Sequence, residues 1–443
     1  MSVFSSSSVA IGIKAESPRY QNGMVAILSV VLGLMTVDQA APFFLGPFIQ
    51  PDLKLTNTQL GLLASVYWTT FAITTYAMSE VADSVGKLKT LLVIMIVAVS
   101  VCSVMAAFAN SFSTLLAARA VMGCVAGPLL PIAQSVVALE SSPARRGTNM
   151  GIVVNVGSST LQGIVAPLVL IKLAVLYGWR VGFLIIVFPS LVGAMLAARF
   201  IRDPTTDEIA QHHVSAARPS GGRLMEALSF HNIWLCIALS CLYFAYMILG
   251  FEFLPLYFVD VRHISSQQMS LLMSLLGIAA AVFGLLLPMA SDRVGRRPVM
   301  VVSSIVSPLC PIAAIYCTGS TAFLAVVLFC GFAFSGTCSL ILGTIPSETV
   351  PSRILTTAMG LVGALGVIGG GIAGPILAGW SADHWGIRTA LLIQAGCAAV
   401  AGLLSMGLHE TAPLKIKSAH EAICTDLIDV PCRSSKAQQR SQD

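Results

Sequence analysis

The stretch Ala82-Asp83-Ser84-Val85-Gly86-Lys87 decides the fold, because it returns 209 residues later as Ser291-Asp292-Arg293-Val294-Gly295-Arg296. A second stretch keeps almost the same spacing: Gly178-Trp179-Arg180 returns as Gly386-Ile387-Arg388, 208 residues later. Both halves of the 443-residue chain therefore carry the same landmarks in the same order. This offset indicates two halves duplicated in parallel.

The composition excludes a soluble protein. Hydrophobic residues make up 56% of the chain and charged residues only 10%, and the mean hydropathy is +0.86. Soluble domains carry about 25% charged residues. Parallel duplication of an apolar chain is typical of secondary transporters built from two bundles. We therefore predict an all-α polytopic membrane protein with twelve transmembrane helices in two pseudo-symmetric six-helix bundles.

The apolar runs divide the chain into two bundles and three polar segments. We predict a cytoplasmic tail over 1–23, a first bundle over 24–201, a cytoplasmic linker over 202–229, a second bundle over 230–409 and a cytoplasmic tail over 410–443. The spans of the first bundle are predicted at 24–49, 57–80, 89–109, 113–138, 148–174 and 181–201. Those of the second are predicted at 230–258, 268–290, 297–317, 321–344, 356–380 and 388–408.

The basic residues predict the orientation. With the N-terminus inside, the cytoplasmic segments collect 19 of the 25 Lys and Arg residues, and the outer loops and outer span ends hold five. Cytoplasmic loops of membrane proteins carry such an excess of Lys and Arg. Both termini are therefore expected in the cytoplasm of a protein in the inner (plasma) membrane.

The two repeated loops are predicted to act as gating loops. Each joins two spans on the cytoplasmic side and pairs a carboxylate with cations beside a glycine turn, and such groups can make contacts in one conformational state only. Ordinary positive loops without a gating role are the alternative. The gating residues are predicted to be Asp83, Gly86, Lys87, Asp292, Arg293, Gly295, Arg296 and Arg297.

At these loops the chain resembles the major facilitator superfamily, whose signature G-x-x-x-D-R-x-G-R-R follows the second and eighth spans. The copy around Asp292 matches it more fully than the copy around Asp83, and Ser79 and Pro288 replace the first glycine. The resemblance covers about residues 24–408. It implies the fold of that superfamily and transport by alternating access.

Further stretches resemble the anion:cation symporter branch of this superfamily, and bacterial relatives of the spinster lipid transporters share parts of the pattern. The stretches are Val37-Asp38-Gln39, Arg119 with Gly123 and Pro128, and Pro346-Ser347-Glu348. Two departures matter. Ala126 stands where the branch has a proton-carrying Glu, and Gln39 stands where it has an Arg.

Ionisable residues inside the spans are costly and have function as their default explanation. Asp38 and Arg119 lie on spans that the resemblance brings together at the cavity. We expect proton binding to Asp38 to free Arg119 for a substrate carboxylate, and a static buried ion pair is the alternative. Glu252 is the substitute proton carrier for the missing Glu, unless it is a hydrated carboxylate at the outer mouth.

Neutral donors complete the predicted binding site, although some of them can instead be satisfied between helices. They are Gln39, Tyr67, Asn155, Gln162, Tyr243 and Tyr246.

The function expected from these residues is secondary transport of a small organic anion, a sugar acid or an aromatic or aliphatic carboxylate, with proton symport. A proton-coupled drug or metabolite efflux antiporter is the alternative, and a non-transporting membrane receptor is a third. No motif offers a nucleophile, a metal cluster or a nucleotide loop, so we expect no enzyme activity, cofactor or metal. The predicted partners are the anion, H⁺ and the lipid bilayer, with no nucleic acid, and the functional unit is expected to be a monomer.

Overall fold

The computed structural model describes residues 18–85, 88–142, 145–153, 157–202, 221–317, 319–351 and 354–412. The regular elements of these residues are helices. The helices of the first half are α1 (Pro18–Leu53), α2 (Asn57–Val85), α3 (Leu88–Ala107), α4 (Phe112–Ala126), α5 (Leu129–Glu140), α6 (Arg146–Gly151), α7 (Gly157–Thr160), η2 (Leu161–Val165), α8 (Ala166–Tyr177) and α9 (Trp179–Phe200).

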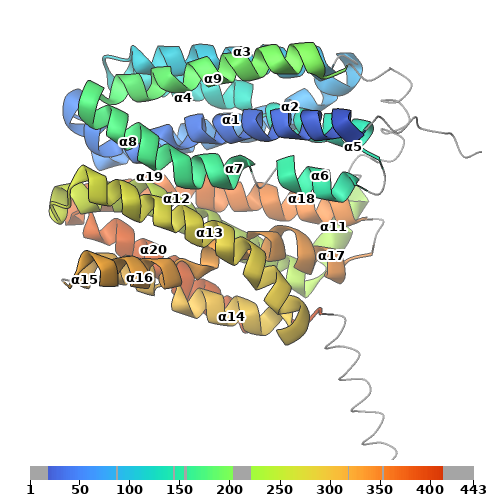
Figure 1. The fold of residues 1–443 in the computed structure, drawn as a ribbon. Helices are drawn as coiled ribbons and strands as arrows, with labels where there is room; N and C mark the ends of the chain where they lie inside the picture. Colours follow the sequence, from blue (N-terminus) through green and yellow to red (C-terminus); the bar gives the residue numbers. More distant parts are fainter. Residues whose placement is uncertain are drawn as a thin grey trace, which may run out of the picture.

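The second half begins with α11 (Gly221–Leu228), which lies inside the predicted linker. After it come α12 (His231–Leu256), η3 (Tyr257–Val261), α13 (Ser266–Val294), α14 (Arg296–Val306), α15 (Leu309–Tyr316), α16 (Thr321–Gly331), η4 (Ala333–Thr337), η5 (Leu340–Thr344), α17 (Ile345–Thr349), α18 (Leu355–Gly366), η7 (Val367–Ile372), α19 (Ala373–Trp385) and α20 (Arg388–Ser405). Figure 1 shows the first half in blue to green above the second half in yellow to red.

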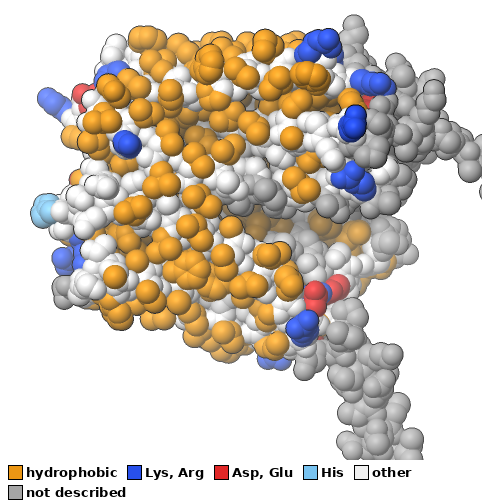
Figure 2. Space-filling model, viewed as in Figure 1, with side chains coloured by type: hydrophobic (Ala, Val, Ile, Leu, Met, Phe, Trp, Pro, Cys, Tyr) orange, Lys and Arg blue, Asp and Glu red, His pale blue; other side chains and the backbone are white. Residues whose placement is uncertain are grey.

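Ten helical segments among the described residues are long and apolar enough to cross a membrane. They coincide with ten of the predicted spans, and α2 and the segment from α6 to α8 occupy the two other predicted positions. Many large apolar side chains on the flank of the molecule are exposed, as Figure 2 shows, while Lys and Arg lie toward its two ends. This is the distribution that a lipid environment requires, and the chain is a multi-pass membrane protein.

The repeat found in the sequence reappears in the backbone. Gly178 between α8 and α9 has φ of 87°, and Gly386 between α19 and α20 has φ of 88°. Glycine adopts this left-handed region without the steric cost that a Cβ imposes. The turn that ends the fifth span is therefore built in the same way as the turn that ends the eleventh span.

The two halves meet most closely at the end opposite the described termini. There α2 packs on α19, where a Cβ on Gly61 would lie 2.1 Å from the Pro375 carbonyl oxygen. In a second crossing, η2 packs on α13, where a Cβ on Gly277 would clash with the backbone of Gly163. Such close approach of helices depends on small residues at the crossing point.

Serine hydroxyl groups form hydrogen bonds close to the same helix crossings. Ser65 Oγ donates to the Ile372 carbonyl oxygen at 2.7 Å, and Ser270 Oγ donates to the Pro167 carbonyl oxygen at 3.0 Å. Serine side chains of one half thus bind backbone carbonyl oxygens of the other half.

Candidate functional site

Arg119 on α4 is the most deeply buried cation of the described residues. Its side chain is 1% exposed, and Ser111 starts its helix with a capping box, in which Ser111 and Thr114 bond each other's backbone. The guanidinium lies over the Tyr67 ring, 4.5 Å from the ring centroid. Such stacking partly replaces the water that the cation loses on burial.

A proline in α1 explains what the guanidinium binds. Pro42 has no N–H for the carbonyl oxygen four residues earlier, so the Asp38 carbonyl loses its helical partner. Arg119 Nη1 donates to that carbonyl oxygen at 3.3 Å, and Nη2 donates to the Gln39 carbonyl oxygen at 2.9 Å. The sequence of α1 thus creates the acceptor that fixes Arg119.

The Asp38 carboxyl group is a neighbour of Arg119 but not its ion-pair partner. Ser103 Oγ donates to Asp38 Oδ1 at 2.6 Å, whereas Oδ2 is buried without a hydrogen bond. Among the described residues, Arg119 forms no ion pair with a carboxylate. The expectation of a direct Asp38–Arg119 pair is therefore wrong for this conformation, because the backbone of α1 takes the guanidinium instead.

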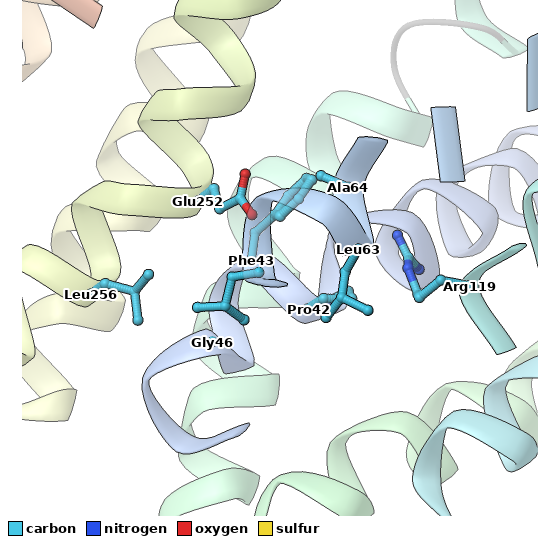
Figure 3. A pocket seen from close by; sticks show the side chains of 9 residues that line it. Pro42, Phe43, Gly46, Leu63, Ala64, Arg119, Glu252 and Leu256 are labelled. Atoms are coloured by element: carbon cyan, nitrogen blue, oxygen red, sulfur yellow. The ribbon is translucent and has the colours of Figure 1, made fainter. Parts of the chain in front are cut away.

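Glu252 on α12 faces the same pocket as Arg119. Figure 3 shows the two charged side chains on opposite sides of this pocket, between α1 and α2 of the first half and α12 of the second. Glu252 is only 4% exposed, and its Oε2 has no hydrogen bond. The alternative of a hydrated carboxylate at the outer mouth is therefore wrong. The other lining residues are Pro42, Phe43, Gly46, Leu60, Leu63, Ala64 and Leu256.

Unsatisfied polar atoms gather in this region. Buried polar groups in folded proteins normally have hydrogen-bond partners, and each exception needs an explanation. Of the eight such side-chain atoms among the described residues, five belong to neighbouring positions of α1, α2, α4 and α12: Asp38 Oδ2, Tyr67 Oη, Trp68 Nε1, Arg119 Nε and Glu252 Oε2. The cluster indicates a site that a polar ligand completes.

Two predicted lining residues have a packing role instead. Tyr243 Oη donates to the Ser335 carbonyl oxygen at 3.2 Å. Tyr246 Oη, fully buried, donates to the Gly331 carbonyl oxygen at 3.0 Å. Both hydroxyls bind the backbone of their own half, so neither is available to a ligand.

The structure describes two of the three remaining neutral candidates, Gln39 and Gln162. Gln39 is half-buried and contributes its backbone carbonyl to Arg119. Gln162 is half-buried in η2, which packs against α13. Asn155 lies outside the described residues.

The second predicted gating loop forms an ionic network at the end of the molecule where the described termini lie. Arg296 donates from Nη2 to Glu348 Oε1 at 2.8 Å and from Nε to Glu348 Oε2 at 3.2 Å. Its Nη1 donates to Asp292 Oδ1 at 2.5 Å. The two hydrogen bonds to Glu348 form a bidentate arginine–carboxylate pair, which is the strong form of this interaction. The network joins α13, α14 and α17, all in the second half.

Glu410 completes the network in a way that the sequence did not reveal. Its carboxylate accepts hydrogen bonds from the backbone N–H groups of Arg296, at 2.7 Å, and Arg297, at 3.1 Å, at the start of α14. Gly295 has φ of 115°, and a Cβ there would lie 2.6 Å from Glu410 Oε2. Arg293 and Arg297 are exposed. The Asp83 side chain, Gly86 and Lys87 of the first loop lie outside the described residues.

A second carboxylate that the sequence did not single out, that of Asp383, joins the two halves. Asp383, near the end of α19, accepts hydrogen bonds from the backbone N–H groups of Asn57 and Thr58, both at 2.8 Å, and from both side chains. A carboxylate at a helix N-terminus satisfies free N–H groups and complements the helix dipole. Asp383 thus caps α2 from the other half of the protein.

Comparison with known proteins adds relatives of similar length. The chain is 26% identical over 385 residues to the hexuronate transporter of Bacillus subtilis, covering 84% of this chain and 90% of the relative. It is 25% identical over 426 residues to the probable 4-methylmuconolactone transporter of Cupriavidus pinatubonensis, covering 92% and 95%.

Solved structures show the same fold at low identity. A bacterial homologue of the human lysosomal transporter Spinster, in its inward-facing and unoccupied conformation, superposes with a TM-score of 0.69 at 16% identity, covering 88% of this chain and 97% of that structure. The Major Facilitator Superfamily model matches the chain twice, over residues 27–267 and 235–434. Because these matches span both halves, the chain belongs to the Major Facilitator Superfamily and is a membrane transporter rather than an enzyme.

Proposed function

We propose that this transporter moves a small organic anion across the inner membrane by alternating access, with proton symport. The observation that carries the proposal is Arg119, a cation 1% exposed that lines a pocket between the two halves. The names of the hexuronate and 4-methylmuconolactone transporters support an organic acid or a close derivative as the substrate class.

Arg119 is the proposed binding group for the anionic end of the substrate. A guanidinium has five N–H donors. Two of those of Arg119 are directed at the α1 carbonyl oxygens, and Nη1 also donates to Met122 Sδ at 3.2 Å. Nε has no partner among the described residues. The remaining donors can therefore bind a carboxylate while the backbone of α1 holds the side chain in place. Tyr67 lies under the guanidinium and adds its unsatisfied hydroxyl group.

Asp38 is the proposed proton carrier. Its Oδ2 has no partner, so this atom can gain and lose a proton without breaking an existing hydrogen bond. Its backbone carbonyl binds Arg119, and the Asp38 side chain and the anion site therefore lie on one short segment of α1. A change of charge on Asp38 would be felt by the cation that holds the substrate. Glu252 is the second candidate for the proton.

Alternating access is proposed to use the contacts between α2 and α19. Asp383 and the glycine crossings hold the two halves together at the end opposite the described termini. With the termini in the cytoplasm, as the basic residues predict, this closed end faces outward. The ionic network of Arg296 holds the cytoplasmic ends of the second half in the present state. Opening of the outer end requires the Asp383 contacts to break.

The proposal is tested with proteoliposomes of the purified protein in weakly buffered medium, to which a panel of organic acids is added. Alkalinisation of the external medium on addition of one acid, absent from protein-free vesicles, is the expected result and identifies proton symport. A panel of sugar acids and aromatic acids that produces neither pH change nor exchange of labelled acid, in vesicles shown to be tight, would contradict the proposal.

Efflux of a cationic compound is the second candidate function. Glu252 places a carboxylate in the same pocket as Arg119, and a carboxylate can also bind an organic cation. Gly370 and Gly374 on the predicted eleventh span have a spacing similar to that of an antiporter motif, but they do not add to this candidate. A Cβ on Gly370 would lie 2.0 Å from the Cys241 carbonyl oxygen, so this glycine serves the packing of η7 on α12. Acidification of the medium on addition of a cation, instead of alkalinisation by an acid, would favour efflux.

A further inference from the structure

We infer that Glu252 makes the pocket selective for monoanions that carry a hydrogen-bond donor opposite their anionic group, and that it rejects dianions. The inference rests on the proposed function, because it assumes that Arg119 binds the anionic end of the substrate. It goes further by assigning the chemical group at the other end of the substrate, which Glu252 contacts.

The pocket has one charge of each sign and no other ionisable side chain among its lining residues. Arg119 comes from α4 in the first half, and Glu252 comes from α12 in the second half. Figure 3 shows Pro42, Phe43 and Leu63 between them. A ligand that spans the pocket therefore meets a cation at one end, an apolar middle and a carboxylate at the other end.

Aromatic packing holds the turn of α12 that carries Glu252. Phe251, adjacent to Glu252, makes an edge-to-face contact with Phe44 of α1, with ring centroids 6.1 Å apart. On the opposite side Phe251 contacts Phe332, at 5.9 Å. The turn of α12 that carries Glu252 is thus packed both against α1 and against the second half.

The chemistry of the Glu252 carboxylate determines which groups of a ligand it can bind. An ionised carboxylate is an acceptor only, so its unsatisfied Oε2 can bind a hydroxyl or amine group of the ligand. A second carboxylate on the ligand would face the ionised form of Glu252 as a like charge in a buried site, where Coulomb repulsion is stronger than in bulk water. A hydroxy acid therefore gains a hydrogen bond at the position where a diacid meets repulsion.

The test compares acids that differ only in the group opposite the carboxylate. The aromatic pair is 3-hydroxybenzoate and isophthalate, and the sugar-acid pair is gluconate and glucarate. Dissociation constants are measured by isothermal titration calorimetry on the purified full-length protein in detergent. In the unmodified protein the hydroxy acid of at least one pair should bind about tenfold more tightly than its diacid, the factor expected from a difference of about 1.4 kcal/mol.

Glu252→Gln is the decisive variant, because it removes the charge and keeps the size. We expect the diacid to gain affinity and the preference to fall to about twofold or less, a residual difference of a few tenths of a kcal/mol. Glu226→Gln on α11 is the matched control: it removes the same charge outside the pocket and should keep the preference. Melting temperatures of both variants check that they are folded.

The outcomes separate the inference from the proposed function. Equal binding of hydroxy acid and diacid by the unmodified protein, or a preference that Glu252→Gln leaves unchanged, overturns the charge selection while anion binding stands. Binding of none of the four acids by the folded protein counts against the organic-anion function itself, and the inference fails with it.

Discussion

At the scale of single residues, the proposed anion site depends on the planar fork of Arg119. Lysine at this position keeps the charge but cannot reach the Asp38 and Gln39 carbonyl oxygens and a substrate together. We expect Arg119→Lys to weaken binding of a transported acid about tenfold or more, the loss of one charged hydrogen bond, with a smaller effect on folding. Calorimetric titration measures the affinity, and Arg388→Lys at the exposed start of α20 is the control. Unchanged affinity would remove Arg119 from the site.

The proton carrier is tested at the same scale by Asp38→Asn. The amide keeps an acceptor for Ser103 Oγ, which donates at 2.6 Å to the present carboxylate, but it cannot exchange a proton. We expect uphill uptake in proteoliposomes to be lost while exchange of labelled acid across the membrane continues. Accumulation equal to that of the unmodified protein would move proton coupling to Glu252.

At the scale of elements, we expect the prolines of α1 to differ in their effect on the Arg119 site. Pro42→Ala restores an N–H for the Asp38 carbonyl oxygen, and this N–H competes with Arg119 for the same acceptor. We expect the variant to melt at an equal or higher temperature and to bind the substrate several-fold more weakly, by about 0.5–1.5 kcal/mol, the net contribution of one hydrogen bond.

Pro47→Ala is the matched control, since it changes a second buried proline of α1 without supplying an N–H to the Asp38 carbonyl oxygen. An equal loss of affinity in both variants would show that the shape of α1, rather than the freed carbonyl group, determines binding.

At the scale of the whole molecule, we expect closure of the end opposite the described termini to depend on Asp383. Its four hydrogen bonds to Asn57 and Thr58 link α19 to α2 across the two halves. Asp383→Asn removes the negative charge from the α2 N-terminus, where it contributes about 0.3–1 kcal/mol, and leaves one oxygen to accept instead of two. We expect a larger population that is open at this end.

Spin labels at Lys54 and Arg388, one in each half near this end, measure the opening as longer distances in double electron–electron resonance, in a background without native cysteines. Asp52→Asn is the control. Asp52 lies at the same end but binds Trp179 and Arg180 of its own half. A distance distribution that Asp383→Asn leaves unchanged, or that Asp52→Asn shifts equally, would contradict the role of Asp383.

The sequence predicted the fold well because its signals are local. A hydrophobic segment long enough to span a bilayer needs no distant partner to be recognised, and the offset between Asp83 and Asp292 reports duplication directly. Gly178 and Gly386, paired by their spacing, share one backbone conformation. The same reasoning selected Asp38, Arg119 and Glu252, since charged residues inside apolar segments are few and costly.

The partners of these residues could not be predicted, because hydropathy does not say which helices touch. Tyr243 and Tyr246 combine an aromatic ring with a hydroxyl group, as ligand-binding residues often do. Their hydroxyls nevertheless bind carbonyl oxygens of neighbouring helices. Arg119 binds the backbone of α1 rather than the Asp38 carboxylate.

By itself, then, the sequence determined a membrane protein of two related halves and the short set of buried charges at its centre, since burial of charge and bilayer thickness act on each segment separately. Only the tertiary structure decided that Arg119 and Glu252 face one pocket, that Glu410 caps α14 and that Asp383 caps α2. Those contacts join residues far apart in the chain, and they exist only where helix packing brings an acceptor within hydrogen-bond distance of a donor.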